Sequence, residues 1–175
     1  MKAVVQRVRD ASVSVNGKRV GQIGCGLLVY LGVAHDDTAT DADWMAEKII
    51  NLRIFDDDDG KMNRSLLDVV NHNNLQVNKM VNHDKNEVNG TVGVLAISQF
   101  TLLGDARKGR RPSWGKAAPP EQARKLYDYF IEQVRQGGLP CECGEFQAVM
   151  QVTYTNDGPV TILLDTAEVR TTGAI

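Results

Sequence analysis

Two uninterrupted apolar runs place the strongest constraint on how this 175-residue chain can fold. They are GLLVYLGV at residues 26–33 and GVLAISQF at residues 93–100. A strand with one solvated face alternates apolar and polar residues, whereas a continuous run is typical of a strand buried on both faces. Both runs therefore predict strands in the interior of a sheet that other elements cover.

Helical patterns and further strands supply that cover. Residues 40–55 (TDADWMAEKIINLRIF) predict a helix that Thr40 or Asp41 can cap, and residues 119–138 predict a second helix that begins with proline and ends at glycine. Further strand patterns lie at residues 2–15, 18–23, 146–155 and 159–166, the first two separated by an Asn-Gly hairpin signal. We expect a single α/β domain over residues 1–175, with curved, largely antiparallel, barrel-like sheets and two main helices packed on one side.

Composition narrows the class of protein. A formal charge of −2 gives no global basic field that would attract nucleic acid, although it leaves room for a local basic patch. Three cysteines without a CxxC spacing predict reduced thiols and a cytoplasmic protein, and the Cys-x-Cys pair at residues 141–143 has no further Cys or His at ligand spacing. Residues 1–15 lack a long apolar stretch, so we expect neither a signal peptide nor a membrane anchor.

Two polar segments carry features that resemble metal sites, and we interpret both as loops. Residues 71–90 (NHNNLQVNKMVNHDKNEVNG) are rich in Asn and predict a solvated loop or an extended hairpin inserted into the domain. Within it, His72 and His83 lack the carboxylate and Cys neighbours that a metal site needs. Residues 55–63 (FDDDDGKMN) look like a calcium loop, but counting back from the glycine puts Phe55 at the first ligand position, so we expect a tight turn.

The sequence contains none of three common catalytic motifs. It has no Gly-x-Ser-x-Gly nucleophile elbow, no His-Glu-x-x-His zinc motif and no phosphate-binding loop. Ser98, Gln99 and Thr101 stand at the end of a buried strand, where polar groups are either paired or used. Residues 105–120 (DARKGRRPSWGKAAPP) fit either a solvated basic loop or a patch that contacts phosphates beside a stacking aromatic. Residues 156–159 (NDGP) interrupt a strand with the four residue types that strands use least.

Several of these stretches together resemble one known family. The chain is similar to the D-aminoacyl-tRNA deacylases over almost its whole length, apart from residues 71–90. The matching stretches, in order, are MKAVVQRVRDASVSVNGKRVGQIGCGLLVYLGV, LRIFDDDDGKMNRSL, SQFTLLGDARKGRRPSW, LYDYF and NDGPVT. The paired motifs SQFT and NxGPVT are specific to this family. Gln147 departs from the family's usual pattern, in which a small residue is common, whereas Met150 is retained.

The resemblance implies how the chain would read its substrate. It implies a homodimer in which each subunit inserts a Gly-Pro step with a cis peptide bond, here Gly158-Pro159, into the active site of its partner. Backbone carbonyls that face the aminoacyl group would read chirality without reading the side chain, because glycine lets the backbone approach closely. The side chain of an L-amino acid would point into the Gly-Pro backbone, whereas a D-amino acid or glycine would place no side chain there. Arg7 would brace the Gly-Pro loop.

The resemblance also assigns the remaining site residues. Ser98, Gln99 and Thr101 are the expected catalytic residues, whose backbone N–H groups, with the Thr101 hydroxyl, would hold the ester carbonyl and its developing oxyanion. Phe100 and Met150 would pack against the terminal adenine. The other expected contacts are Ala118 to the aminoacyl group and Arg107, Lys108, Arg110 and Arg111 to tRNA phosphates.

The expected function is hydrolysis of the ester in D-aminoacyl-tRNA, and in mischarged glycyl-tRNA, by a homodimer that needs no cofactor. Because no side-chain acid–base pair brackets SQFT, the 2′-hydroxyl of the terminal ribose is the candidate that orients or activates the water, or takes part directly. Two alternatives stay open. One is a non-catalytic module that binds tRNA ends, and the other is a relative with a trans Gly-Pro bond that removes mischarged L-amino acids.

Overall fold

The computed structural model describes residues 1–76, 90–173 and 175, which form one domain around a curved sheet. Its elements are β1 (Lys2–Val15), β2 (Lys18–Ile23), β3 (Gly26–Gly32), α1 (Ala39–Ile50), β4 (Phe55–Asp56), β5 (Met62–Arg64), α2 (Leu66–Gln76), β6 (Gly93–Ser98), the 3₁₀ helix η1 (Phe100–Leu103), α3 (Pro120–Gln136), β7 (Cys141–Cys143), β8 (Met150–Asp165) and α4 (Thr166–Arg170). None of the helices in these ranges is both long and apolar enough to cross a membrane.

The main sheet has a mixed arrangement, with strand order β2-β1-β3-β6-β7 and with β8 also paired to β1. β1 runs antiparallel to β2, β3 and β8, whereas β6 runs parallel to both β3 and β7. The sheet curls until β2 approaches β7, so that a Cβ at Gly21 would lie 2.8 Å from the carbonyl oxygen of Cys143. The predicted α/β fold with a curved, barrel-like sheet is confirmed, and the parallel pairs are an addition that the sequence patterns did not predict.

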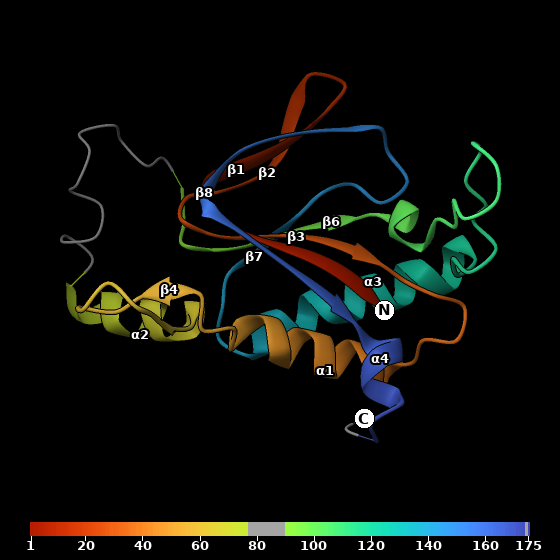
Figure 1. The fold of residues 1–175 in the computed structure, drawn as a ribbon. Helices are drawn as coiled ribbons and strands as arrows, with labels where there is room; N and C mark the ends of the chain where they lie inside the picture. Colours follow the sequence, from red (N-terminus) through yellow and green to blue (C-terminus); the bar gives the residue numbers. More distant parts are fainter. Residues whose placement is uncertain (77–89, 174) are drawn as a thin grey trace.

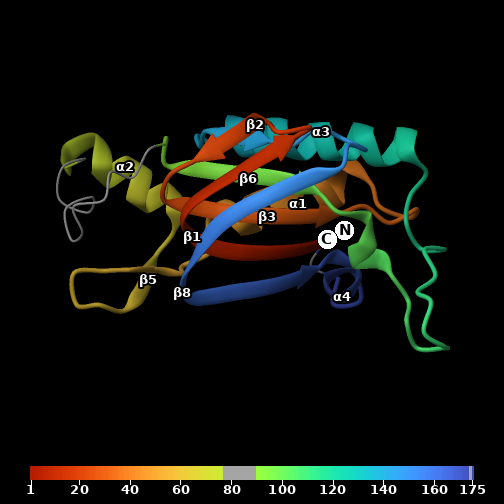
Figure 2. The ribbon, with the colours of Figure 1, turned by 90° about the horizontal axis from the view of Figure 1, so that it is seen from above.

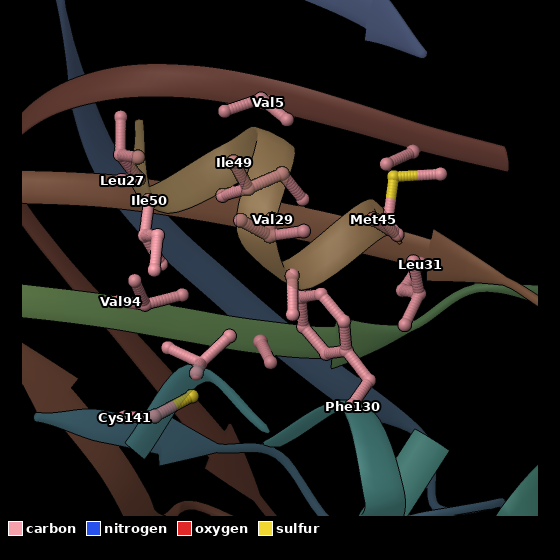
Figure 3. Close-up of a cluster of buried hydrophobic side chains, with 14 of the residues drawn as sticks. Val5, Leu27, Val29, Leu31, Met45, Ile49, Ile50, Val94, Phe130 and Cys141 are labelled. Carbon is pink, nitrogen blue, oxygen red and sulfur yellow. The ribbon is translucent and has the colours of Figure 1, made fainter. Parts of the chain in front are cut away.

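Both faces of β3 are buried, as its apolar run predicted. Leu27 and Val29 belong to a core between the sheet and the two main helices, whereas Leu28 belongs to a second core inside the curl of the sheet. Figure 1 shows α1 and α3 side by side on one face of the sheet, and Figure 3 shows Ile49 of α1 and Phe130 of α3 converging on the strands. The predicted packing of two main helices on one side is therefore confirmed.

Local side-chain hydrogen bonds set the start of α1. The N-cap is Thr38, whose backbone N–H and hydroxyl both donate to Asp41 Oδ2 at 2.9 Å. The prediction that Thr40 or Asp41 caps this helix was wrong, because Asp41 instead accepts these bonds from the third helical position of a capping box. The second predicted helix is α3, which begins at Pro120 and ends before Gly137.

Of the two polar segments that were predicted as loops, one is a turn in the structure and the other begins as helix. Residues 55–64 form the β4–β5 hairpin, in which Asp57 accepts bonds from the backbone N–H groups of Asp59 and Lys61 and Gly60 has a φ of 74°, so the tight turn is confirmed. Residues 71–76 continue α2, so the loop expected there was wrong. The rest of the predicted insert, apart from its last residue, lies outside the described residues.

The start of α2 explains why a polar stretch continues as helix. The hydroxyl of Ser65 donates to Asp68 Oδ2 at 2.7 Å, and the backbone N–H of Asp68 donates back to that hydroxyl at 3.1 Å. This reciprocal pair caps the first turn, and the buried side chains of Leu66 and Val69 anchor that turn to the core. A helix that begins well can extend through residues of modest propensity.

Candidate active site

A cavity of about 520 Å³ opens where four separate parts of the chain meet. These parts are the end of β6 with η1, the segment that leads into α3 with the first turns of that helix, the loop that leads into β8 with the start of that strand, and the end of β3. Five of the predicted site residues line the cavity, namely Ser98, Gln99, Phe100, Ala118 and Met150. The remaining lining is mostly apolar and comprises Leu31, Val33, Ile97, Ala117, Pro120, Ala123, Tyr127, Phe146, Gln147, Ala148 and Val152. An apolar hollow with a few polar groups in its wall is the usual form of a small-molecule site.

The SQFT stretch forms the polar part of the wall. After Ser98 the chain leaves β6, and the backbone N–H of Gln99 still donates to the carbonyl of Leu31 at 2.8 Å. The side-chain amide of Gln99 donates to the hydroxyl of Thr101, and Leu102 N donates to Gln99 O at 3.3 Å. Thr101 itself does not line the cavity, but its hydroxyl is held against a residue that does.

The segment before α3 is anchored to the sheet. Ala118 N donates to the carbonyl of Val33 at 2.9 Å, and Ala117 forms an isolated β-bridge with Ala34. Tyr127 of α3 is buried in the cavity floor, where its hydroxyl donates to Ala96 O at 2.8 Å. Burial raises the pKa of Tyr127, so this hydroxyl stays a neutral donor at physiological pH.

The third wall belongs to the loop between β7 and β8. Met150 packs so closely on Gly144 that a Cβ there would lie 2.4 Å from the Met150 sulfur. Gln147, at the rim, has a φ of 66°, a backbone conformation that residues other than glycine rarely adopt. The sequence marked Gln147 only as a departure from the family pattern, and neither its backbone conformation nor its place in the cavity wall was predicted.

The basic stretch is held beside the cavity. Phe100 and Trp114 meet edge to face, with ring centroids 5.3 Å apart, and both are partly exposed. Asp105 and Ser113 exchange two backbone hydrogen bonds of 2.9 Å, which close the intervening residues into a loop. The predicted tRNA contacts Arg107, Lys108, Arg110 and Arg111 are all exposed on this loop. Figure 2 shows the stretch between η1 and α3 projecting from one end of the molecule.

One of these basic side chains is already paired within the loop. Arg107 Nε donates to Asp105 Oδ1 at 2.8 Å, and a second guanidinium nitrogen contacts Asp105 Oδ2. Hydrogen bonds from Arg107 hold the pKa of the Asp105 carboxyl well below its ordinary value. Asp105 therefore stays ionised and offsets part of the positive charge of the loop.

Gly158 and Pro159 lie apart from this cavity, on the β1–β8 pairing. The register passes from Gln6 opposite Thr161 to Val8 opposite Asn156, so residues 157–160 bulge out of the ladder. The peptide bond between Gly158 and Pro159 is cis, and Gly158 has a φ of 116°. None of the cavity-lining residues comes from this bulge.

Two side chains hold the bulge at its base. The amide of Asn156 donates to the carbonyls of Arg7 at 2.9 Å and of Val160 at 3.0 Å, and so closes both ends. Arg7 is buried, and its Nε lies 3.0 Å from a carboxylate oxygen of Asp157, while its Nη1 donates to Ile54 O at 2.7 Å. Arg7 therefore contacts the bulge, and its role as a brace of the Gly-Pro step stays a prediction. The role of Asn156 was missed, although its place in the NxGPVT motif was a signal for it.

Sequence comparisons point to one family. The profile of the family described as D-Tyr-tRNA(Tyr) deacylase matches residues 4–165. The D-aminoacyl-tRNA deacylase of Thermosipho africanus (strain TCF52B) is 52% identical over 169 residues, which cover 97% of this chain and 99% of that protein. The D-aminoacyl-tRNA deacylase of Fervidobacterium nodosum is 54% identical, with the same two shares covered.

Solved structures show the same architecture. One described as c-Myc DNA unwinding element binding protein superposes with a TM-score of 0.78 at 40% identity, covering 94% of this chain and 98% of that chain. Another, described as a probable eukaryotic D-amino acid tRNA deacylase, has a TM-score of 0.65 at 16% identity and shows the fold alone. On the match of the family profile and the identity of its relatives, this chain belongs to the D-Tyr-tRNA(Tyr) deacylase family.

Proposed function

We propose that this protein hydrolyses the ester between a D-amino acid and the terminal adenosine of tRNA, and that it also removes glycine from mischarged tRNA in the cytoplasm. The cavity carries this proposal, because it gathers the first three residues of SQFT, Ala118 and Met150 from separate parts of the chain. Its volume of about 520 Å³ suits a nucleoside-sized group. Membership of the deacylase family supplies the class of reaction.

The SQFT stretch would hold the reacting ester. Because the amide of Gln99 donates to the Thr101 hydroxyl, that hydroxyl keeps its own hydrogen for an oxygen of the substrate. The backbone N–H groups at the start of η1 and the Ser98 side chain would complete the contacts to the developing oxyanion. Phe100 and Met150 would pack against the adenine, with Ala118 beside the aminoacyl group.

Proton transfer would fall to the substrate. Among the described residues that line the cavity there is no His, Cys, Asp, Glu or Lys. The 2′-hydroxyl of the terminal ribose stands next to the ester and can orient or activate the attacking water. A D-aminoacyl-tRNA that ends in 2′-deoxyadenosine should therefore bind with nearly unchanged affinity and be hydrolysed very slowly. Cleavage of this deoxy substrate at the normal rate would place the catalytic group on the protein.

Chiral selection would come from a second subunit. The bulge that carries Gly158 and Pro159 lies outside the cavity of its own chain, and β8 pairs only with β1 among the described strands, which leaves its other edge open. Leu163 of β8 is 75% exposed and Val149 is 88% exposed. In the proposed homodimer, two such surfaces meet and Gly158 of the partner subunit faces the aminoacyl group. In this dimer the bulge would take part in substrate selection, which it cannot do from its position outside the cavity of its own chain.

The direct test compares ester loss from D-aminoacyl-tRNA, glycyl-tRNA and L-aminoacyl-tRNA in the presence of the protein. Loss of the D-amino acid and of glycine, with the L-amino acid retained, is the expected result. Binding of all three without hydrolysis would favour the non-catalytic module. Selective loss of the L-amino acid would favour an editing enzyme of the opposite chirality.

A further inference from the structure

A second hollow lies beside the active-site cavity. It is a groove of about 440 Å³ that is lined by Lys2, Leu103, Gly104, Asp105, Ala106, Arg107 and Lys116. We name these residues the lysine groove. Figure 2 shows the N-terminal end of β1 and η1 at the same end of the molecule.

The lysine groove and the cavity share two short segments and one aromatic pair. Within η1, Phe100 lines the cavity and Leu103 lines the groove, and in the segment before α3 the groove residue Lys116 directly precedes cavity residues. Trp114 meets Phe100 edge to face and also lies against Gly104, where a Cβ would be 2.6 Å from its ring. The aromatic pair therefore connects a residue of the cavity wall, Phe100, with a residue of the groove wall, Gly104.

The basic side chains of the groove differ in whether they already pair with a carboxylate of the protein. Arg107 is hydrogen bonded to Asp105, and Lys2 Nζ lies 3.3 Å from Asp165 Oδ2. Lys116 has no ion pair among the described residues, and its charge is only the last of the causes that lower the pKa of Asp105, after the hydrogen bonds and charge of Arg107. Lys116 is thus the cation in this groove with the most positive charge left for a ligand.

The backbone at Lys116 is fixed even though its side chain is free. The carbonyl of Lys116 accepts a hydrogen bond of 3.1 Å from His35 N, and the next two residues are tied to the end of β3 by the bridge and hydrogen bond described above. A cation on an anchored backbone beside a cavity is well placed to bind a phosphate, because little chain order has to be gained on binding.

We propose that the lysine groove is a phosphate subsite for the single-stranded 3′ end of tRNA, and that Lys116 supplies its main charge while Lys2 assists. This inference rests on the proposed function. If the cavity holds the terminal nucleoside, the strand must continue across the rim, and its phosphodiesters are the anions that follow. The exposed basic residues of the loop that do not line the groove, Lys108, Arg110 and Arg111, would meet phosphates further along the tRNA.

The experiment compares two substrates that differ in phosphate content. One is D-tyrosyl-tRNA, and the other is 3′-O-D-tyrosyl-adenosine, which carries the ester and the adenosine but no phosphate. The variants are Lys116→Ala, the charge-preserving Lys116→Arg, and Lys61→Ala as the matched control. Lys61 is an exposed lysine in the β4–β5 turn at the opposite end of the molecule (Figure 2).

We expect Lys116→Ala to lower kcat/KM for D-tyrosyl-tRNA by about fivefold at low salt and to leave hydrolysis of D-tyrosyl-adenosine unchanged. Lys116→Arg should keep most of the activity on tRNA, and Lys61→Ala should keep all of it. The slope of log affinity for tRNA against log salt should become shallower by about 0.7, the value for one phosphate contact on a single strand.

Three results would overturn the subsite. The first is equal behaviour of Lys116→Ala and Lys61→Ala on tRNA, the second is equal loss on both substrates, and the third is an unchanged salt slope. Failure of the proposed function looks different, because the wild-type protein would then cleave neither substrate. In that case the salt slope for uncharged tRNA still decides whether the lysine groove binds phosphate.

Discussion

Gln147 holds a left-handed backbone conformation at the rim of the cavity, with a φ of 66°. For a residue with a Cβ this conformation costs about 1–2 kcal/mol, and glycine avoids that cost while losing about 0.5–1 kcal/mol through its greater freedom in the unfolded chain. Gln147→Gly should therefore raise the free energy of unfolding by about 0.5–1 kcal/mol, measured by urea denaturation. Gln147→Ala keeps the Cβ and should bring no such gain. Equal stability of the two variants would show that the backbone at this position is not strained.

Gly158 is a second position at which the presence or absence of a Cβ should affect the protein strongly. A Cβ there would lie 2.8 Å from Cγ2 of Val160 and 3.2 Å from Nη2 of Arg7, on a backbone with a φ of 116°. We expect Gly158→Val to lower kcat/KM for D-aminoacyl-tRNA on the order of 100-fold, because the bulge and its two carbonyls would shift. The loss should exceed that of Thr101→Ala.

Gly60→Ala is the control for the cost of backbone strain alone. Gly60 has a φ of 74° with no atom within 4 Å of an added Cβ, and it lies in the β4–β5 turn away from the cavity. This variant should lose some stability and retain its activity. If Gly158→Val kept the wild-type rate and the preference for D over L, the proposed chiral wall would be wrong.

At the scale of elements, sequence pattern predicted burial better than it predicted partners. The continuous apolar run at residues 26–33 predicted that β3 is buried on both faces. In the structure its side chains point alternately into the two hydrophobic cores. The same pattern cannot state that β6 pairs with β3 in parallel, since periodicity records which faces are covered and not which strand lies alongside. The continuation of α2 through residues 71–76 was missed for a related reason, because an Asn-rich composition hides a helix that starts from a strong cap.

The bulge of β8 depends on one amide at its base. Asn156 donates to the carbonyls of Arg7 and Val160, so Asn156→Ala would leave both acceptors without this partner. We expect a loss of about 1–2 kcal/mol in the free energy of unfolding and a fall in kcat/KM for D-aminoacyl-tRNA, measured by urea denaturation and by ester hydrolysis.

Gln6→Ala is the control on the same pair of strands. It removes an exposed hydrogen bond of 3.2 Å from Gln6 Nε2 to the Thr161 hydroxyl, and it should change both measurements little. If Asn156→Ala matched this control, the bulge would be held by the β1–β8 ladder and not by the amide.

At the scale of the whole molecule, sequence motifs predicted individual site residues but not how those residues are arranged in space. The SQFT residues, Ala118 and Met150 were each assigned through the family resemblance, and the cavity brings all but Thr101 of them into one lining. Tyr127 and Phe146 were not assigned, because a cavity made from four distant segments has no local sequence signature. The separation of Gly158 from that cavity appears only in the folded chain, and it makes the number of subunits the central question.

Subunit mixing tests that question. Gly158→Val would disable the bulge that a subunit offers, and Ala118→Phe would fill the cavity that a subunit uses. In a mixed dimer, the cavity of the Gly158→Val subunit is intact and would receive an intact bulge from the Ala118→Phe subunit. Each mixed dimer therefore has one complete site of two, and random reassortment makes half of the dimers mixed.

An equal mixture of these two inactive variants, unfolded and refolded together, should recover roughly a quarter of wild-type activity on D-aminoacyl-tRNA, since half of the dimers carry half of the sites. Each variant refolded alone is the control and should stay near background. Size-exclusion chromatography should show a dimer in every sample. A mixture that stays as inactive as its components would place the bulge and the cavity of each site within one chain, and full activity in a monomer would exclude the shared site.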